Sequence, residues 1–179
     1  MSLPPFELPV LGGRTLRFPT GRTALLIFWW SECPTCRLSL PIIAAACRAF
    51  GGSADVAVIA QDPPADRPVL EAAGAACPVL DDAALETAWR FGVDAVPAVI
   101  LAGPSGEELQ RFVGFARADW EALFDRLRAR TGCEPPAIDW SGFPAWRPGC
   151  GPRNFLPAEY ERLQAALGPF QPPPGGNTR

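Results

Sequence analysis

The feature that most constrains this chain is a pair of cysteines, Cys33 and Cys36, placed directly after an apolar run and at the start of a helix-like segment. Residues 24–29 are continuously apolar, which is typical of a strand buried on both faces of a mostly parallel sheet. The cysteines therefore stand where a strand ends and a helix begins. There Cys33 gains the positive end of the helix dipole and unpaired backbone N–H groups, which favour its thiolate. Because Cys36 lies one turn later, near enough to close a disulfide, the spacing predicts a redox dithiol.

A structural zinc half-site is the alternative explanation for two cysteines at this spacing. It would need two further Cys or His ligands, and the chain has no His and no second Cys-x-x-Cys, so we expect neither a metal nor a cofactor. The lack of His also excludes His-based triads and His general bases. All 16 basic residues are Arg, which excludes Schiff-base chemistry at Lys and Walker-type phosphate binding. Cysteine is therefore the one obvious nucleophile.

The length and the net charge limit the domain organisation and the partners that we expect. Its 179 residues suffice for one globular domain with an appendage, and a net charge of −3 gives no reason to expect a nucleic acid or an anionic membrane as partner. Residues 1–9 have neither a basic region nor an apolar region of a signal peptide, and no stretch approaches membrane-spanning length. We expect a cytoplasmic monomer without membrane insertion, or a periplasmic protein if the N-terminus is processed.

The predicted elements alternate between strands and helices and then end in a hairpin and a helix, which indicates an α/β sandwich around a mixed sheet. In chain order, we expect a hairpin over residues 6–18, a strand over 24–29, a helix over 34–50 kinked at Pro41, a strand over 55–60, a short helix, a brief strand at 79–80, a helix over 83–91, an antiparallel hairpin of strands 98–101 and 109–113, and a helix over 118–130.

The C-terminal part is rich in Pro and Gly but is not featureless. Trp140, Phe143 and Trp146 are too apolar to leave in water, and residues 157–167 form one amphipathic helical pattern. We therefore expect a domain over residues 1–131, an extension over 132–170 that packs on it, and a disordered tail over 171–179.

With these elements in place, the sequence resembles the thioredoxin superfamily and, within it, the TlpA/ResA-like redoxin branch, over roughly residues 4–130. The resemblance implies a thioredoxin-like three-layer sandwich with a mixed central sheet, an N-terminal hairpin, a central insertion between Cys36 and Pro97, and a C-terminal extension. It is carried by Phe28-Trp29 at the end of the apolar strand, Cys33-Pro34-Thr35-Cys36, Pro41, Val96-Pro97 before a hairpin, and Gly114 after its second strand.

The resemblance implies a thiol-disulfide oxidoreductase that acts on protein thiols and disulfides. Cys33 would attack a partner disulfide and Cys36 would resolve the mixed disulfide, with Cys33 exposed and Cys36 largely covered. The family also has a cis bond at the position of Val96-Pro97, which would lie beside Cys33 and present the Val96 backbone to a partner peptide. The alternative is an ordinary trans proline that heads an edge strand. The catalytic and partner-binding residues that follow are Cys33, Cys36, Pro97, Trp30, Pro34, Thr35 and Val96.

Three positions near the dithiol depart from the family pattern. Ile27 stands where thioredoxins carry a buried Asp, and Ser39 stands where TlpA/ResA-like members often place a Glu, so Cys36 has no obvious carboxylate base. Glu32 replaces the Trp that normally precedes the first cysteine. It either shuttles protons or disfavours the neighbouring thiolate by like-charge repulsion, which Arg37 would offset, or it is a solvated surface residue.

The other four cysteines have separate interpretations. Cys47 and Cys77 are most simply small buried apolar residues. Cys133 and Cys150 lie in the extension that the resemblance does not cover, and they form a structural disulfide, stay free, or act as a second redox relay or metal pair.

Two rival functions remain open. A peroxiredoxin would need Thr or Ser three residues before its reactive Cys, where this chain has Trp30. A redoxin-like accessory module, which binds one partner or holds a metal during maturation of another protein, is the stronger alternative because of the departures at Ile27, Glu32 and Ser39.

Overall fold

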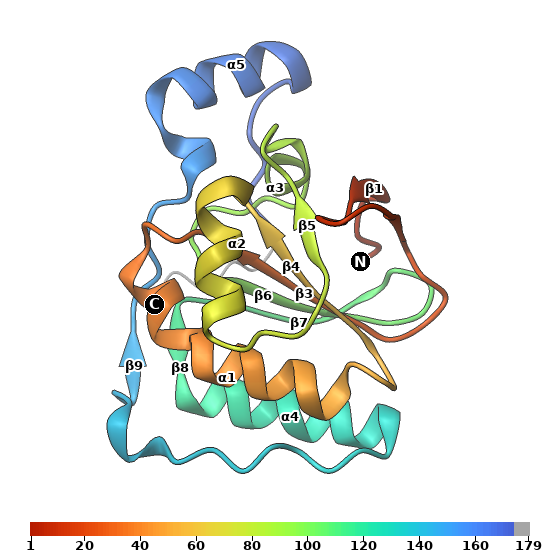
Figure 1. Cartoon of the computed structure of the whole chain (residues 1–179). Coiled ribbons are helices and arrows are strands. Elements are labelled where there is room, and N and C mark those ends of the chain that lie inside the picture. The colour runs from red at the N-terminus through yellow and green to blue at the C-terminus, as the bar shows by residue number, and fades with distance from the viewer. Residues whose placement is uncertain (174–179) are drawn as a thin grey trace.

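The centre of the molecule is a mixed five-stranded sheet with the order β5-β4-β3-β6-β7. The structure is a computed structural model that describes residues 1–173 (Figure 1). In the middle, β3 (Ala24–Trp29) pairs in parallel with β4 (Asp55–Ala60) and antiparallel with β6 (Ala98–Ala102). The edges are β5 (Val79–Asp81) and β7 (Glu108–Val113). All of β3 is buried, as its uninterrupted apolar sequence predicts.

Helices α1 (Pro34–Phe50) and α4 (Arg117–Thr131) run side by side along one face of this sheet, below it in Figure 1. Their contact includes Phe50 and Phe124, whose ring centroids lie 6.0 Å apart. Pro34 occupies the first turn of α1, where a missing N–H costs nothing, and the helix continues through Pro41. The two helices therefore form one outer layer of the sandwich.

The opposite face is covered by α3 (Glu86–Arg90) and by a separate hairpin of β1 (Phe6–Pro9) and β2 (Thr15–Phe18). Phe91, directly after α3, lies 5.4 Å from Phe28 of the sheet, measured between ring centroids. The insertion between β4 and β6 contains α2 (Pro63–Ala72), β5 and α3. The expected thioredoxin-like sandwich, with its hairpin and insertion, is confirmed.

The start of α3 differs from its prediction. We expected a helix from residue 83, but Leu85 has a positive φ of 62° and α3 begins at Glu86. The buried carboxylate of Asp82 accepts hydrogen bonds from the backbone N–H groups of Thr87 and Ala88, which fixes the helix start at this point.

The C-terminal extension runs along the far side of α4, turns past the start of α1 and ends at the opposite end of the molecule (Figure 1). Its middle part packs through aromatic rings, since Phe143 lies 5.6 Å from Phe115 between centroids. At its end, Leu163 is buried against Leu85 and Trp89. The extension contains the short helices η1 (Trp140–Gly142) and η2 (Arg153–Phe155), the strand β9 (Trp146–Arg147) and the helix α5 (Pro157–Leu167). Its strand β9 pairs with β8 (Phe115–Ala116), which directly precedes α4.

The segment that we expected to be disordered, residues 171–179, is described only to Pro173, and residues 174–179 lie outside the described part. The backbone carbonyl of Gln171 lies close against Gly92. Within residues 1–173, no helix has the length and apolar character needed to cross a membrane.

Candidate active site

Cys33 caps the first turn of α1. Its backbone is extended, with φ of −88° and ψ of 115°, and its sulfur accepts the backbone N–H of Cys36 at 3.2 Å. A sulfur in this position receives an otherwise unpaired helix N–H and the positive end of the helix dipole. Both interactions favour negative charge on the sulfur, so Cys33 has the surroundings of a nucleophile or of a thiolate leaving group.

Cys36 is fully buried one turn into α1 and its thiol is free. The indole N–H of Trp29 donates to the Cys36 carbonyl oxygen at 2.9 Å, which holds the end of β3 against the start of the helix. Burial raises the pKa of the Cys36 thiol well above its ordinary value. Cys36 therefore reacts only when its proton has an acceptor nearby.

Asp66 is the carboxylate that the sequence did not reveal at this site. It lies on α2, is fully buried, and accepts the backbone N–H groups of Ser31 at 2.7 Å and Asp62 at 2.9 Å. Burial raises its pKa, while these hydrogen bonds oppose the shift. Its charge acts on Cys36 and further raises the pKa of that thiol. Asp66 of the insertion is thus a carboxylate whose charge acts on Cys36, and it lies outside the two positions, Ile27 and Ser39, where the family pattern would place one.

The Val96–Pro97 peptide bond is cis, as the resemblance implies. The Cys33 sulfur lies 3.3 Å from the Val96 carbonyl oxygen, so the two segments meet at one point. Pro97 is tied in place because its carbonyl oxygen accepts the N–H of Gly114 at 2.8 Å. The site therefore combines a thiol at a helix start with an adjacent strand edge.

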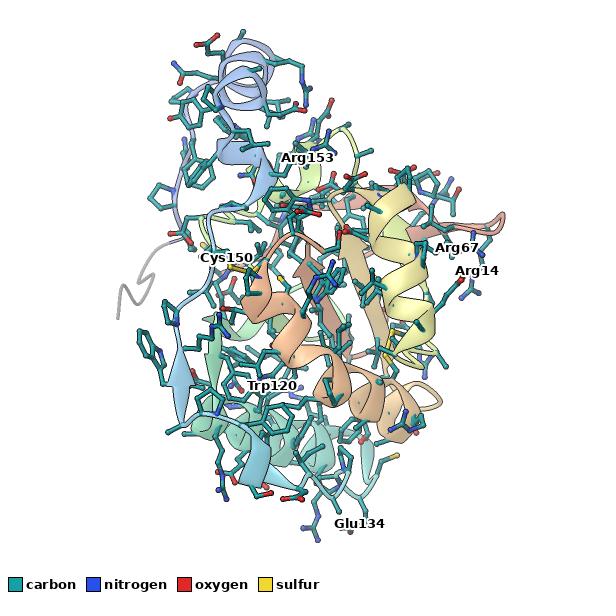
Figure 2. The ribbon with its side chains drawn as sticks, turned by 60° about the vertical axis from the view of Figure 1, so that its left-hand side comes forward. Arg14, Arg67, Trp120, Glu134, Cys150 and Arg153 are labelled. Atoms are coloured by element: carbon teal, nitrogen blue, oxygen red, sulfur yellow. A yellow bond between two sulfur atoms is a disulfide. The ribbon has the colours of Figure 1, made fainter. Side chains whose placement is uncertain are left out.

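The C-terminal extension reaches this point and bonds to it, because the structure contains a disulfide between Cys33 and Cys150 (Figure 2). The two Cα atoms are 5.7 Å apart, within the usual range for a disulfide. Two expectations are corrected here. Cys33 is not exposed, since the extension leaves only 1% of it accessible, and its sulfur is paired with Cys150 rather than with Cys36.

Of the alternatives left open for Cys133 and Cys150, a disulfide between them is not formed, since Cys150 pairs with Cys33 and Cys133 is free. Cys133 lies two residues after the end of α4, where its sulfur is 3.1 Å from the Ser53 hydroxyl. Cys150 lies three residues after β9, which pairs with β8 just before the first residue of α4. The 15 residues of α4 separate these two places by about 22 Å. The extension runs the length of the helix before it turns, so the two cysteines end up far apart.

Cys47 and Cys77 form a second disulfide, which corrects their interpretation as separate core residues. Cys47 lies in the last turn of α1, and Cys77 lies in the loop between α2 and β5. Their Cα atoms are 5.4 Å apart. The bond therefore ties the insertion to the outer helical layer.

The remaining predicted residues surround the dithiol in different ways. Thr35 is buried, and its hydroxyl donates to the Pro148 carbonyl oxygen at 2.8 Å, so it contacts the extension. Arg37 donates to the Ser31 carbonyl oxygen at 2.6 Å, and the Ser39 hydroxyl donates to the Thr35 carbonyl oxygen at 3.0 Å. The other three differ in exposure: Trp30 is half-buried, and Glu32 and Pro34 are exposed.

Comparison with known proteins places this fold among thioredoxin-like proteins. No family model and no curated protein matches the sequence. A provisionally named thiol:disulfide interchange protein DsbE from Chlorobium tepidum is 28% identical, with a TM-score of 0.65 over 73% of this chain and 96% of that one. A provisionally named thioredoxin from Neisseria meningitidis is 26% identical, with a TM-score of 0.62 over 72% and 91%. A secreted disulfide oxidoreductase from Mycobacterium tuberculosis, homologous to DsbE, is 21% identical, with a TM-score of 0.59 over 69% and 95%.

Proposed function

We propose that this chain, a redoxin-type member of the thioredoxin superfamily, exchanges electrons with protein disulfides through Cys33 and Cys36. One observation carries the proposal. The Cys33 sulfur caps α1 beside the backbone of Val96, and the free thiol of Cys36 lies one turn below it. A nucleophile, a strand edge for a partner peptide and a resolving thiol are thus gathered at one point.

In the reduced protein, the Cys33 thiolate would attack one sulfur of a partner disulfide and release the other partner sulfur as a thiolate. The backbone N–H and carbonyl of Val96 would hold the partner segment as an added strand. Cys36 would then lose its proton and attack Cys33, which closes a Cys33–Cys36 disulfide and frees the partner as a dithiol. Asp66, a buried carboxylate whose charge acts on Cys36, would accept that proton.

Trapping of mixed disulfides tests which cysteine attacks. Since Cys150 already occupies Cys33, the trap variant must combine Cys36→Ser with Cys150→Ser. We expect this variant to accumulate mixed disulfides with partner proteins, and we expect the matched Cys33→Ser/Cys150→Ser variant to accumulate none. Mixed disulfides formed by the second variant alone would assign the attack to Cys36 and overturn the proposal.

A narrower function, that of an accessory module for one partner, is favoured by the 1% exposure of Cys33. A general reductase needs an accessible nucleophile, whereas an accessory protein needs access only for its own partner. Reduction of insulin separates the two functions. A general reductase would reduce insulin at a rate comparable with that of a thioredoxin, and an accessory module would not.

A further inference from the structure

Cys150 lies on the backbone edge of Val96 as an added strand residue. The N–H of Val96 donates to the Cys150 carbonyl oxygen at 2.9 Å, and the N–H of Cys150 donates to the Val96 carbonyl oxygen at 2.8 Å. The two residues thus form an antiparallel bridge. Both backbone groups of Val96 that could bind a partner peptide are therefore already used by the chain itself.

The residues just before Cys150 fit closely onto the same surface. Pro148 accepts the hydroxyl of Thr35 at 2.8 Å. Gly149 passes so close to the domain that an added Cβ would lie 2.9 Å from Cβ of Ala95 and 3.1 Å from the Val96 carbonyl oxygen. An added Cβ on Gly114 would in turn lie 2.6 Å from the Gly149 nitrogen. This approach of two backbones is possible only because both positions are Gly.

The residues just after Cys150 are also held by specific contacts. Asn154 is fully buried, donates to the Val93 carbonyl oxygen at 3.0 Å and accepts the side-chain amide of Gln61 at 3.0 Å. The backbone N–H of Arg153 donates to the side-chain oxygen of Gln61 at 2.8 Å. The extension is therefore fixed on both sides of Cys150, which presents that sulfur to Cys33.

We propose that Cys150 is a third redox cysteine, which forms an intramolecular mixed disulfide with Cys33 in the place of a partner peptide and which Cys36 displaces. This inference rests on the proposed function, because it assigns a further catalytic residue to the same thiol-disulfide exchange.

The exchange balances without any added oxidant or reductant. Cys36 loses its proton, its thiolate forms a bond to the Cys33 sulfur, and the bond between Cys33 and Cys150 breaks. Cys150 leaves as a thiolate that takes up one proton. The protein thus has two oxidised forms of equal electron count. The form with the Cys33–Cys150 bond is closed to partners, and the form with the Cys33–Cys36 bond leaves Cys150 as a thiol.

Docking of the extension also sets the access of partners to Cys33. A tethered segment has an effective concentration of about 1 mM at the Val96 edge. A partner protein at about 10 μM that competes for the same edge is therefore outnumbered about 100-fold. Removal of the Cys150 sulfur or of the close fit at Gly149 should therefore increase the rate at which Cys33 reacts with partners.

Disulfide mapping of the full-length protein tests the chemistry. The protein is oxidised with glutathione disulfide, quenched with acid, alkylated and mapped by peptide mass spectrometry. We expect the Cys33–Cys150 peptide in the wild type, nearly complete Cys33–Cys150 bonding in Cys36→Ser, and only Cys33–Cys36 bonding in Cys150→Ser. The matched control, Cys133→Ser, should match the wild type. Complete alkylation of Cys150 in both the wild type and Cys36→Ser would refute the proposal.

A second pair of variants tests the fit without changing a cysteine. Gly149→Ala places a methyl group against Ala95 and Val96, whereas Gly151 has no heavy atom within 4 Å of an added Cβ and serves as the control. We expect Gly149→Ala to lose the Cys33–Cys150 peptide and to react with a model disulfide peptide about tenfold faster than Gly151→Ala. Equal disulfide maps and equal rates for the two variants would refute a docked role for the extension.

The two proposals fail in different ways. One outcome is that neither the wild type nor Cys150→Ser reduces any substrate disulfide, while the wild type still forms the Cys33–Cys150 bond. In that case the proposed function fails and the internal exchange stands. If Cys150→Ser exchanges with a substrate disulfide at the same rate as Cys133→Ser and the wild type shows no Cys33–Cys150 peptide, the third redox cysteine fails and the proposed function stands.

Discussion

Removal of the disulfide between Cys47 and Cys77 should cost about 3.5 kcal/mol of unfolding free energy. The bonded residues are 30 positions apart in the chain. In the chain-entropy account, closing a loop of that length in the unfolded state stabilises the folded protein by about 3.5 kcal/mol at 25 °C. The loop spans the end of α1, β4 and α2, so its closure restrains the insertion that carries Asp66.

Chemical unfolding of the wild type and of the double variant Cys47→Ala/Cys77→Ala measures this contribution. Both residues are replaced, so that neither Cys47 nor Cys77 is left as an unpaired thiol that could form a new bond. The loss of two small apolar groups also costs stability, and that part is the same with or without reductant. The difference between the two proteins should therefore be about 3.5 kcal/mol larger under oxidising conditions than with excess dithiothreitol.

The bond between Cys33 and Cys150 is present in both proteins, so its reduction cancels in the comparison. Equal differences in stability with and without dithiothreitol would refute the reasoning. They would mean that Cys47 and Cys77 act only as buried apolar residues, which is how their sequence surroundings were interpreted.

Four other changes should have distinct effects. Burial raises the pKa of Asp82 to about 6, so the folded state holds the Asp82 proton more tightly than the unfolded state does. The stability that this proton contributes is fully present below about pH 4, and the free energy of unfolding falls by about 3 kcal/mol as the pH rises through 6. Asp82→Asn should abolish this pH dependence in urea unfolding. Leu163→Ala should destabilise the docking of α5 by about 2–3 kcal/mol, seen as faster hydrogen exchange in α5 but not in β3. Asp66→Asn should lower the pKa of the Cys36 thiol, which titration by thiolate absorbance would show, and should slow the resolving step because the proton acceptor is lost; an unchanged pKa would exclude a charge effect. Glu32→Gln should raise the reduction potential, measured against glutathione buffers, by less than about 30 mV at low salt and not at all in high salt, because Glu32 is exposed.

The sheet and its outer helices could be predicted because local patterns determine them. The strand from Ala24 to Trp29 is apolar without interruption, and it accordingly lies at the centre of the sheet. Pro34 marks the first turn of α1, and a turn that contains Gly103 and Gly106 connects β6 to β7. Each of these features depends on residues close together in the chain, so the sequence contains the information in readable form.

The parts of the site that come from the extension and the insertion, Cys150 and Asp66, could not be predicted in the same way. Cys150 lies 117 positions after Cys33, and nothing in the residues around it shows which cysteine it will meet. Only Gly149 offers a signal, since a glycine lets the backbone beside Cys150 approach another strand closely. Asp66 was missed for a similar reason. Its position in α2 shows a helix residue, and only the packing of the insertion brings its carboxylate to Ser31.

The placement of the three sulfurs also determines where an external reductant can act. The Cys33 sulfur is covered and the Cys36 thiol is buried, whereas Cys150 is partly exposed. Exchange is faster when the expelled sulfur is the more stable thiolate, and Cys33 has that stability because it caps α1. Access and leaving-group stability therefore both direct an incoming thiolate to the Cys150 sulfur, with Cys33 as the leaving group. The extension thus protects the nucleophile while providing the sulfur through which it is released.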